Sequence, residues 1–366
     1  MKSIYYIGIM SGTSLDGVDA ALADFSALPP RLEQTFFIPY DASLCDQILI
    51  LHQSGDNELH QAATLSNKLS QLYARAVNSL LKNSCLEPQS IVAIGCHGQT
   101  IRHCPESGNN YTIQLVNAAL LAELTDITVV ADFRSRDIAA GGQGAPLVPA
   151  FHQAIFNTAC GNRAIVNIGG ISNVTYLEQN KPVIGFDCGP GNLLMDAWCL
   201  RHTGNRYDKN GVWAASGKII PALLEKFLSF QFFSLLPPKS TGRDMFNLNW
   251  LESHLLGKEQ PEDVQATLVQ LTTIAIANSI FEHCANTQDI YICGGGARNN
   301  TLISQLKQAL PGKKIELTDE LGIDADWVEA FAFAWLAQQT MMGVPSNLPA
   351  VTGARENRIL GAIYQR

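Results

Sequence analysis

Each half of the 366-residue chain opens in the same order, with an apolar strand, a Gly-rich polar turn and a second apolar stretch. The first instance covers residues 4–23 and predicts a β-hairpin, and the second covers residues 164–186. Helices and further buried strands are expected after each one. This repeated order favours an internally duplicated α/β fold, and a doubly wound single domain with one nucleotide crevice is the alternative.

Apolar spacing locates the other elements. Residues 59–80 have the period of a long helix, and apolar runs predict strands at 91–96, 127–131 and 290–293. Further helices are expected at the positions 267–284, from about 301, and 327–341.

The length suits two domains of about 100 to 200 residues each, with a cleft between them. We expect a first lobe of residues 1–132 with about 345–366, and a second lobe of residues 133–344. The return of the tail to the first lobe is an expectation that the residues themselves do not show.

Composition excludes several classes of protein. The chain is 46% hydrophobic and 16% charged, as expected of an ordered globular protein, and its net charge of -8 argues against nucleic-acid binding. Nine cysteines without a Cys-x-x-Cys pair are typical of a reducing compartment. The first apolar run is too short for a signal peptide, and no uninterrupted apolar stretch approaches about 18 residues. We therefore expect a cytoplasmic protein with no membrane partner.

The turn at residues 8–19 is the most informative segment. Gly12 and Gly17 let the backbone approach a ligand closely, and the N–H groups between them can form a nest for an anion. Thr13 and Ser14 add hydroxyl donors. Phosphate is the expected ligand, and an ordinary hairpin turn is the alternative.

Two carboxylates, Asp16 and Asp19, adjoin this turn and would repel a phosphate unless a divalent cation intervened. We expect Mg²⁺ there, held directly or through water, while an Asx turn cap is the alternative for Asp16. The Walker lysine loop is absent, because Gly217-Lys218 is followed by Ile219 and lacks the upstream glycine.

Two more Gly-rich segments follow predicted strands, at residues 167–173 and 294–299. Strand C-termini are where α/β folds bind ligands, so both segments are candidate nucleotide contacts. Gly294–Gly296 would let a flat adenosine group approach, and a tight strand-to-helix connection accounts for them equally well.

One carboxylate, Asp187, ends a predicted strand before a Gly-Pro-Gly turn. A carboxylate fixed in this way can accept a proton from a nucleophile, and a turn cap is the alternative.

Two polar clusters also follow strands, at residues 96–100 and 132–144. His97, Gln99 and Thr100 offer hydrogen bonds to a sugar, and Arg134 or Arg136 could hold a carboxylate as a bidentate fork. Zinc ligation by His97 is disfavoured, because no carboxylate or Cys lies at a zinc-like spacing.

The run Gly-Ile-Met-Ser-Gly-Thr-Ser-Leu-Asp-Gly-Val-Asp at residues 8–19 resembles the opening of anhydro-N-acetylmuramic acid kinases. The resemblance continues in the family's order over nearly the whole chain, at residues 97–100, 131–134, 167–173, 186–192 and 294–299. That family belongs to the acetate kinase, sugar kinase and actin superfamily. The resemblance therefore implies a two-lobed actin and hexokinase-like fold, a duplicated ribonuclease H-like α/β architecture with an interlobe cleft.

The resemblance also implies residue roles. Met10 and Ser11 stand where the superfamily usually has an Asp in its first phosphate loop, which moves the expected base to Asp187. The implied contacts to ATP are Gly12, Thr13, Ser14, Leu15, Asp16, Gly17, Val18, Asp19, Gly169, Gly170, Asn173, Gly294, Gly295 and Gly296. The sugar contacts would be His97, Gln99, Thr100, Asp132, Arg134 and Glu329, and a solvated helix position is the alternative for Glu329.

The implied reaction opens 1,6-anhydro-N-acetylmuramic acid with water and phosphorylates its 6-oxygen with ATP and Mg²⁺. The partners are then a small sugar and ATP, and a homodimer is an option. A conventional hydroxyl sugar kinase and a non-enzymatic actin-like nucleotide switch are the alternatives.

Overall fold

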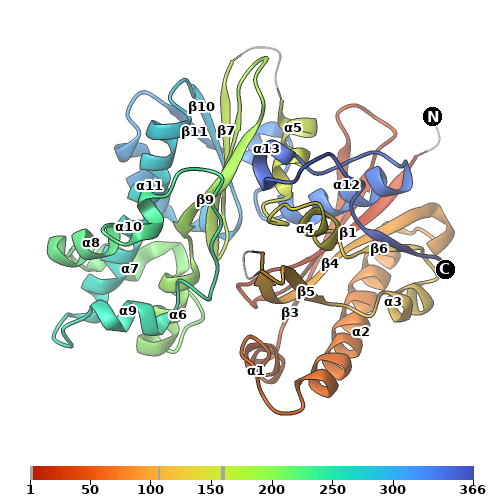
Figure 1. The fold of residues 1–366 in the computed structure, drawn as a ribbon, viewed down its shortest axis with the longest axis horizontal. Coiled ribbons are helices and arrows are strands. Elements are labelled where there is room, and N and C mark those ends of the chain that lie inside the picture. Colours follow the sequence, from red (N-terminus) through yellow and green to blue (C-terminus); the bar gives the residue numbers. More distant parts are fainter. Residues whose placement is uncertain (1–2, 106–107, 158–160) are drawn as a thin grey trace. The chain divides into compact units, whose positions relative to one another are not determined.

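A computed structural model of the protein describes residues 3–105, 108–157 and 161–366. The chain divides into two compact units (Figure 1). Unit 1 comprises the described residues up to Ile155 together with Trp327–Arg366, and unit 2 comprises those within Phe156–Asp326. Each unit contains one β-sheet.

Unit 1 contains a seven-stranded sheet in the order β12-β6-β4-β1-β2-β3, with β5 paired to β4. Its strands are β1 (Tyr5–Ser11), β2 (Gly17–Asp24), β3 (Arg31–Pro39), β4 (Ile91–Cys104), β5 (Tyr111–Leu115), β6 (Val129–Ala131) and β12 (Ala362–Tyr364). Its helices are α1 (Ala42–Ile50), α2 (Glu58–Ser84), α3 (Ala118–Thr125), α4 (Ser135–Ala139), α5 (Val148–Phe156), α12 (Val328–Met341) and α13 (Pro349–Thr352), with a 3₁₀ turn at Pro88–Ser90.

Unit 2 contains a five-stranded sheet in the order β11-β10-β7-β8-β9. Its strands are β7 (Arg163–Ile168), β8 (Ile171–Leu177), β9 (Ile184–Pro190), β10 (Asp289–Cys293) and β11 (Lys314–Leu317). Its helices are α6 (Leu193–Thr203), α7 (Val212–Ser216), α8 (Pro221–Leu228), α9 (Leu248–His254), α10 (Pro261–His283) and α11 (Asn300–Ala309). Short 3₁₀ helices lie at Lys209–Gly211, Gln231–Ser234, Gly295–Arg298 and Thr318–Leu321.

The two sheets share one topology. In each unit three antiparallel strands in chain order are followed by a fourth strand that lies parallel to the first, and a fifth lies parallel to the fourth. This gives β3-β2-β1-β4-β6 in unit 1 and β9-β8-β7-β10-β11 in unit 2. The predicted duplication of a ribonuclease H-like α/β unit is thereby confirmed, and so is the hairpin predicted at the start of the first half. The second half also opens with a hairpin, formed by β7 and β8.

Helix α12 packs directly on the first sheet because two glycines remove side chains at the contact. A Cβ atom at Gly8 in β1 would lie 1.8 Å from the Ala330 carbonyl oxygen, and one at Gly95 in β4 would lie 2.0 Å from that of Phe333. On the same two strands, Ile7, Ile9 and Ile94 join a buried cluster with residues of α2. The helix at 327–341 is thus confirmed.

The unit boundaries differ from the predicted ones. Residues 133–155 and 327–344 lie in unit 1 rather than in the second lobe. The cause is aromatic packing, because Phe151 of α5 contacts the rings of Phe331 and Trp335 on α12, which is seated on the first sheet. The tail does return to the first unit, where β12 pairs antiparallel with β6.

Helix α10 is long and apolar enough to cross a membrane by length and composition alone, with a mean hydropathy of 1.4 in its most apolar window. In the protein 78% of that window is buried. The helix contacts β8, β9 and α11, so it serves as a core helix of unit 2.

Candidate functional site

The turn between β1 and β2 is anchored where it leaves β1 by polar side chains. Ser11 Oγ lies 2.8 Å from the Tyr73 hydroxyl oxygen, and Gln99 Nε2 donates to the Gly12 carbonyl at 3.1 Å. Leu15 has a positive φ of 60°, which gives the turn its shape. The structure thus places Gln99 of β4 against the predicted phosphate turn rather than in a separate cluster.

Asp16 caps this turn. Its Oδ1 atom accepts hydrogen bonds from the Gly17 N–H at 2.9 Å and from the Ser14 hydroxyl at 2.7 Å. Asp19 lies on β2 opposite Met10 of β1. The described residues contain no group of three or more His, Cys, Asp or Glu side chains that could hold a metal ion.

Three glycines of the predicted nucleotide turns have room for a side chain. The nearest atom to a Cβ would be 3.6 Å away at Gly12, 3.7 Å at Gly169 and 3.7 Å at Gly295, and none of the three has a positive φ. The protein's own packing therefore does not require glycine at these positions. A ligand that approaches the backbone would fill this space.

Gly294 and Gly296 differ from Gly295. Gly294 has a φ of +80° and its Cβ would lie 2.3 Å from Asn167 Oδ1, and a Cβ at Gly296 would lie 2.3 Å from Ile168 Cγ2. These two glycines allow the turn after β10 to pass close to the end of β7. The tight strand-to-helix connection, one of the two expected explanations, accounts for them.

Three polar side chains form a row across the sheet of unit 2. Asn167 of β7 pairs with Asn173 of β8, which pairs in turn with Asp187 of β9. Directly paired residues present their side chains on the same face of a sheet. The Oδ1 atoms of Asn167 and Asn173 are buried and have no hydrogen-bond partner within the described part of the chain.

Asp187 is only 8% exposed, and a segment that sequence reasoning missed holds it in place. The Thr241 N–H donates to Asp187 Oδ2 at 2.9 Å, and the Asp187 N–H donates to the Lys239 carbonyl at 3.1 Å. Lys239 is itself 7% exposed, with its Nζ atom 4.8 Å from the centre of the Phe232 ring. The Gly- and Pro-rich composition of residues 237–242 was the available signal for this segment.

The turn carrying Gly169 and Gly170 is closed by the turn after β9. The Asn192 N–H donates to the Gly169 carbonyl at 2.8 Å, and the Gly191 N–H donates to that of Gly170 at 2.9 Å. The structure therefore brings the Gly-rich turn at 169–170 next to the end of β9. Asp187 was predicted to end a strand but lies inside β9, because Cys188, Gly189 and Pro190 continue the strand beside β8.

His97 and Arg134 form a direct pair in unit 1. Arg134 donates from Nε and Nη2 to His97 Nε2 at 3.0 and 2.9 Å, and from Nη1 to the Gly144 carbonyl at 2.7 Å. Burial lowers the pKa of His97 well below 6.5, and the Arg134 cation lowers it further. The imidazole is therefore neutral, and because Nε2 accepts, its proton is on Nδ1.

The remaining predicted sugar contacts of unit 1 are spread out. Thr100 Oγ1 accepts from Gln114 Nε2 at 3.2 Å. Asp132 has a positive φ of 58° and, with Arg136, lines a cavity of about 700 Å³ bordered by Arg358. Arg134 is directed to His97 instead, so the two arginines proposed as carboxylate forks lie in different surroundings.

Glu329 lies in the first turn of α12 and is half-buried.

ATP and Mg²⁺ fit these residues. The open space at the three glycines suits phosphate and adenosine groups close to the backbone, and the unpartnered oxygens of Asn167 and Asn173 are of the kind that bind Mg²⁺ directly or through its water.

A family model and several known proteins match this chain over nearly its full length. The family model described as anhydro-N-acetylmuramic acid kinase matches residues 4–366. A protein of that name from Nitrosospira multiformis is 60% identical over 364 residues, covering 100% of both chains. One from Nitrosomonas europaea is 61% identical and one from Pseudomonas fluorescens 52% identical, each over 361 residues, which cover 99% of each relative and 99% and 98% of this chain.

Proposed function

Because the chain belongs to the anhydro-N-acetylmuramic acid kinase family, we propose that it converts 1,6-anhydro-N-acetylmuramic acid, ATP and water into N-acetylmuramic acid 6-phosphate and ADP. The family makes it a phosphotransferase with an alcohol acceptor. The product would return cell-wall sugar from peptidoglycan to amino-sugar metabolism, and the reaction would take place in the cytoplasm.

The chemistry follows from the substrate, whose 6-oxygen is tied to the anomeric carbon in an internal acetal. Asp187 accepts a proton from water, and the water oxygen bonds to the anomeric carbon as the bond to the 6-oxygen breaks. The released 6-oxygen keeps that electron pair and attacks the γ-phosphorus of ATP. The bond from the γ-phosphorus to the bridging oxygen then breaks, and ADP leaves with that electron pair.

The observation that carries this proposal is the fixed, largely buried carboxylate of Asp187, held by the Thr241 N–H at 2.9 Å. An inverting glycosidase pairs its base with an acid that protonates the leaving oxygen. Here the phosphoryl group takes up the charge on that oxygen, so one carboxylate suffices.

We assign ATP binding to the turn Gly12–Asp19, to Gly169, Gly170 and Asn173, and to the turn Gly294–Gly296, in which Gly295 has room for the nucleotide and Gly294 and Gly296 give the turn its close fit. Mg²⁺, when bound with ATP beside Asp16 and Asp19 or the two unpartnered asparagine oxygens, neutralises charge on the β- and γ-phosphates.

Sugar binding is assigned to six side chains. Neutral His97 has its Nε2 atom occupied by Arg134, which leaves the Nδ1–H group as the donor that it can offer to a hydroxyl or carboxylate. The six are His97, Gln99, Thr100, Asp132, Arg134 and Glu329.

Oxygen from labelled water tests the proposal against both alternatives. The label should enter at the anomeric carbon of the product, and the phosphate should carry none. A conventional sugar kinase would incorporate no label, and a nucleotide switch that hydrolyses ATP would place it in free phosphate.

Because the free sugar exchanges its anomeric oxygen slowly with solvent, the reaction time must be short, and unlabelled product held in labelled water serves as the control. Fast NMR before mutarotation should find the anomer formed by inversion. Retention, or label in the phosphate, would overturn the role of Asp187. Comparing ADP release with the anhydro-sugar and with its ring-opened counterpart identifies the acceptor independently.

A further inference from the structure

A second buried carboxylate, Asp137 of α4, has no role in the chemistry above. Its exposed fraction is 0%, and both of its oxygens accept hydrogen bonds. Oδ1 accepts from Asn347 Nδ2 and from Thr352 Oγ1, each at 2.8 Å, and Oδ2 accepts from the Gly144 N–H at 2.8 Å. Hydrogen bonds to a charged acceptor are stronger than those between neutral groups. Asp137 therefore joins Asn347 and Thr352 to Gly144 by strong hydrogen bonds, and we call this group of contacts the Asp137 tie.

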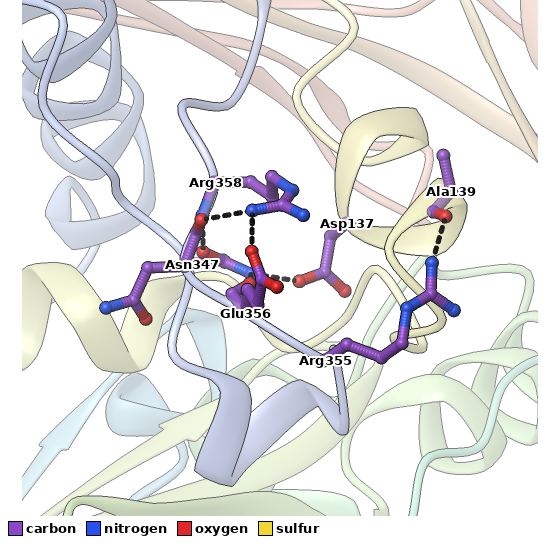
Figure 2. Close-up of polar contacts among 7 residues, drawn as sticks. Asp137, Ala139, Asn347, Arg355, Glu356 and Arg358 are labelled. Atoms are coloured by element: carbon purple, nitrogen blue, oxygen red, sulfur yellow. Dashed lines mark hydrogen bonds and ion pairs between the residues drawn. The ribbon is translucent and has the colours of Figure 1, made fainter.

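Two of these donors come from the C-terminal segment 346–358, 210 and 215 residues away in the sequence. Figure 2 shows how the segment closes around Asn347, whose Oδ1 atom accepts from the Arg358 N–H at 2.6 Å and whose Nδ2 atom also donates to the Glu356 carbonyl. Arg355 reaches back to the Ala139 carbonyl at 3.3 Å. The contacts within the segment thus fix the orientation of the Asn347 amide, which donates to Asp137.

Backbone hydrogen bonds join the same segment to the loop that follows α4. The Gln143 N–H donates to the Thr352 carbonyl at 2.7 Å, and the Arg355 N–H donates to that of Ala140 at 2.9 Å. A Cβ at Gly142 would lie 2.2 Å from Asp137 Oδ2, so the loop fits closely around the carboxylate. Loop 140–144 is held from one side by Asp137 and from the other by the C-terminal segment.

Gly144 connects this tie to the predicted sugar contacts. Its N–H donates to Asp137, and its carbonyl accepts from Arg134 Nη1, whose other nitrogens hold His97. A continuous set of hydrogen bonds therefore runs from the C-terminal segment through Asp137 and Gly144 to the His97–Arg134 pair.

We propose that Asp137 is a positioning residue for sugar binding, which uses Asn347 and Thr352 of the C-terminal segment to fix Gly144 and, through it, the orientation of Arg134 and His97. This role rests on the proposed function for the assignment of His97 and Arg134 to the sugar. The C-terminal segment then supports the sugar site in addition to its structural contacts with unit 1.

The carboxylate is needed because all three of its partners are donors. In Asp137→Asn one of the two oxygens becomes an NH₂ group, which faces either the Gly144 N–H or the Asn347 amide and the Thr352 hydroxyl. The Gly144 N–H and the Asn347 amide nitrogen can only donate, whereas the Thr352 hydroxyl can turn to accept, so the substitution removes the hydrogen bond to Gly144 or the one to Asn347. If the Gly144 side opens, Arg134 loses its carbonyl partner and its hold on His97.

The test compares Asp137→Asn and Thr352→Val with a matched control, Thr125→Val. Thr125 is also a buried threonine of unit 1, but its hydroxyl donates to the Leu121 carbonyl of its own helix. Two readouts are needed, the KM values for sugar and for ATP, and the ¹⁵N NMR signals of the His97 ring, assigned with His97→Gln.

For Asp137→Asn we expect the sugar KM to rise on the order of tenfold, with kcat and the ATP KM nearly unchanged. The His97 signals should move away from the pattern of a ring protonated on Nδ1 with Nε2 as acceptor. Thr352→Val, which removes one donor, should shift both readouts in the same direction by less. Thr125→Val should change neither.

A folded Asp137→Asn protein with the wild-type sugar KM and the wild-type His97 signals would overturn the proposal, and so would an equal rise of the sugar and ATP KM values. If Asp137→Asn does not fold, Thr352→Val decides by the same criteria. Absence of sugar turnover in the wild type would instead refute the proposed function. The His97 signals, recorded without substrate, would still show whether Asp137 controls the pair.

Discussion

Replacing Gly12 by alanine should have opposite effects on the stability of the protein and on its affinity for ATP. The added Cβ would lie 3.6 Å from its nearest neighbour, Ser14 Oγ, at an ordinary backbone φ. We therefore expect no steric cost in the free protein. A Gly-to-Ala change at a compatible position stabilises by about 0.4–1 kcal/mol, because the unfolded chain loses freedom.

Gly8→Ala is the matched control for stability. Its Cβ would lie 1.8 Å from the Ala330 carbonyl oxygen and 2.5 Å from the Ala334 nitrogen, both backbone atoms of α12. Overpacking of a core costs about 1–3 kcal/mol, and backbone atoms cannot rotate out of the way, so the loss should reach or exceed the upper end of that range.

In contrast to its effect on stability, Gly12→Ala should weaken the binding of ATP. A methyl group at Gly12 occupies the space through which a phosphate would approach the N–H groups of the turn. Loss of one hydrogen bond to a charged group costs about 1.5–3 kcal/mol, which raises the dissociation constant of ATP roughly 10- to 100-fold. Gly12→Val should weaken binding further.

Urea unfolding measures stability, and calorimetric titration of the folded variants with ATP and Mg²⁺ measures affinity. Unchanged ATP affinity in stable Gly12→Ala would refute the phosphate-turn assignment. A loss of stability in Gly12→Ala as large as that in Gly8→Ala would show that the glycine serves the fold, contrary to the geometry.

Three further outcomes follow from the same structure. Asp187→Asn keeps an oxygen for the Thr241 N–H but cannot accept the proton of water, so turnover should fall by about 10²- to 10⁴-fold with ATP binding intact, and near-normal turnover would contradict its role. Gly295→Ala should weaken ATP binding without loss of stability, as calorimetry and urea unfolding would report. Burial lowers the pKa of His103 to about 4 and that of His152 to about 3. Just below pH 6.5, therefore, each of these imidazoles binds a proton in the unfolded chain but not in the folded protein. The free energy of unfolding should then fall as the pH drops from about 6.5, by up to roughly 1.4 kcal/mol per pH unit for each histidine, and a flat profile between pH 7 and 5 would exclude this.

Local signals predicted much of the fold. The apolar runs and Gly-rich turns located β1, β2, β7 and β10, and the helical period located α2 and α12. These signals suffice because an apolar run or a turn is specified by neighbouring residues. The edge strands β3 and β5 were not predicted, since their half-exposed sequences carry a weaker hydrophobic pattern.

The sequence by itself determined which residues could carry the chemistry, from turn composition and from the order of the motifs. Only the tertiary structure decided what those residues contact. It seated α12 on the first sheet, set the Thr241 N–H against Asp187, and joined Asp137 to a segment more than 200 residues away. The physical reason is that periodicity reports whether a face is buried but not which partner buries it. Hydrogen bonds between distant segments depend on backbone positions that exist only once the sheets and helices have packed.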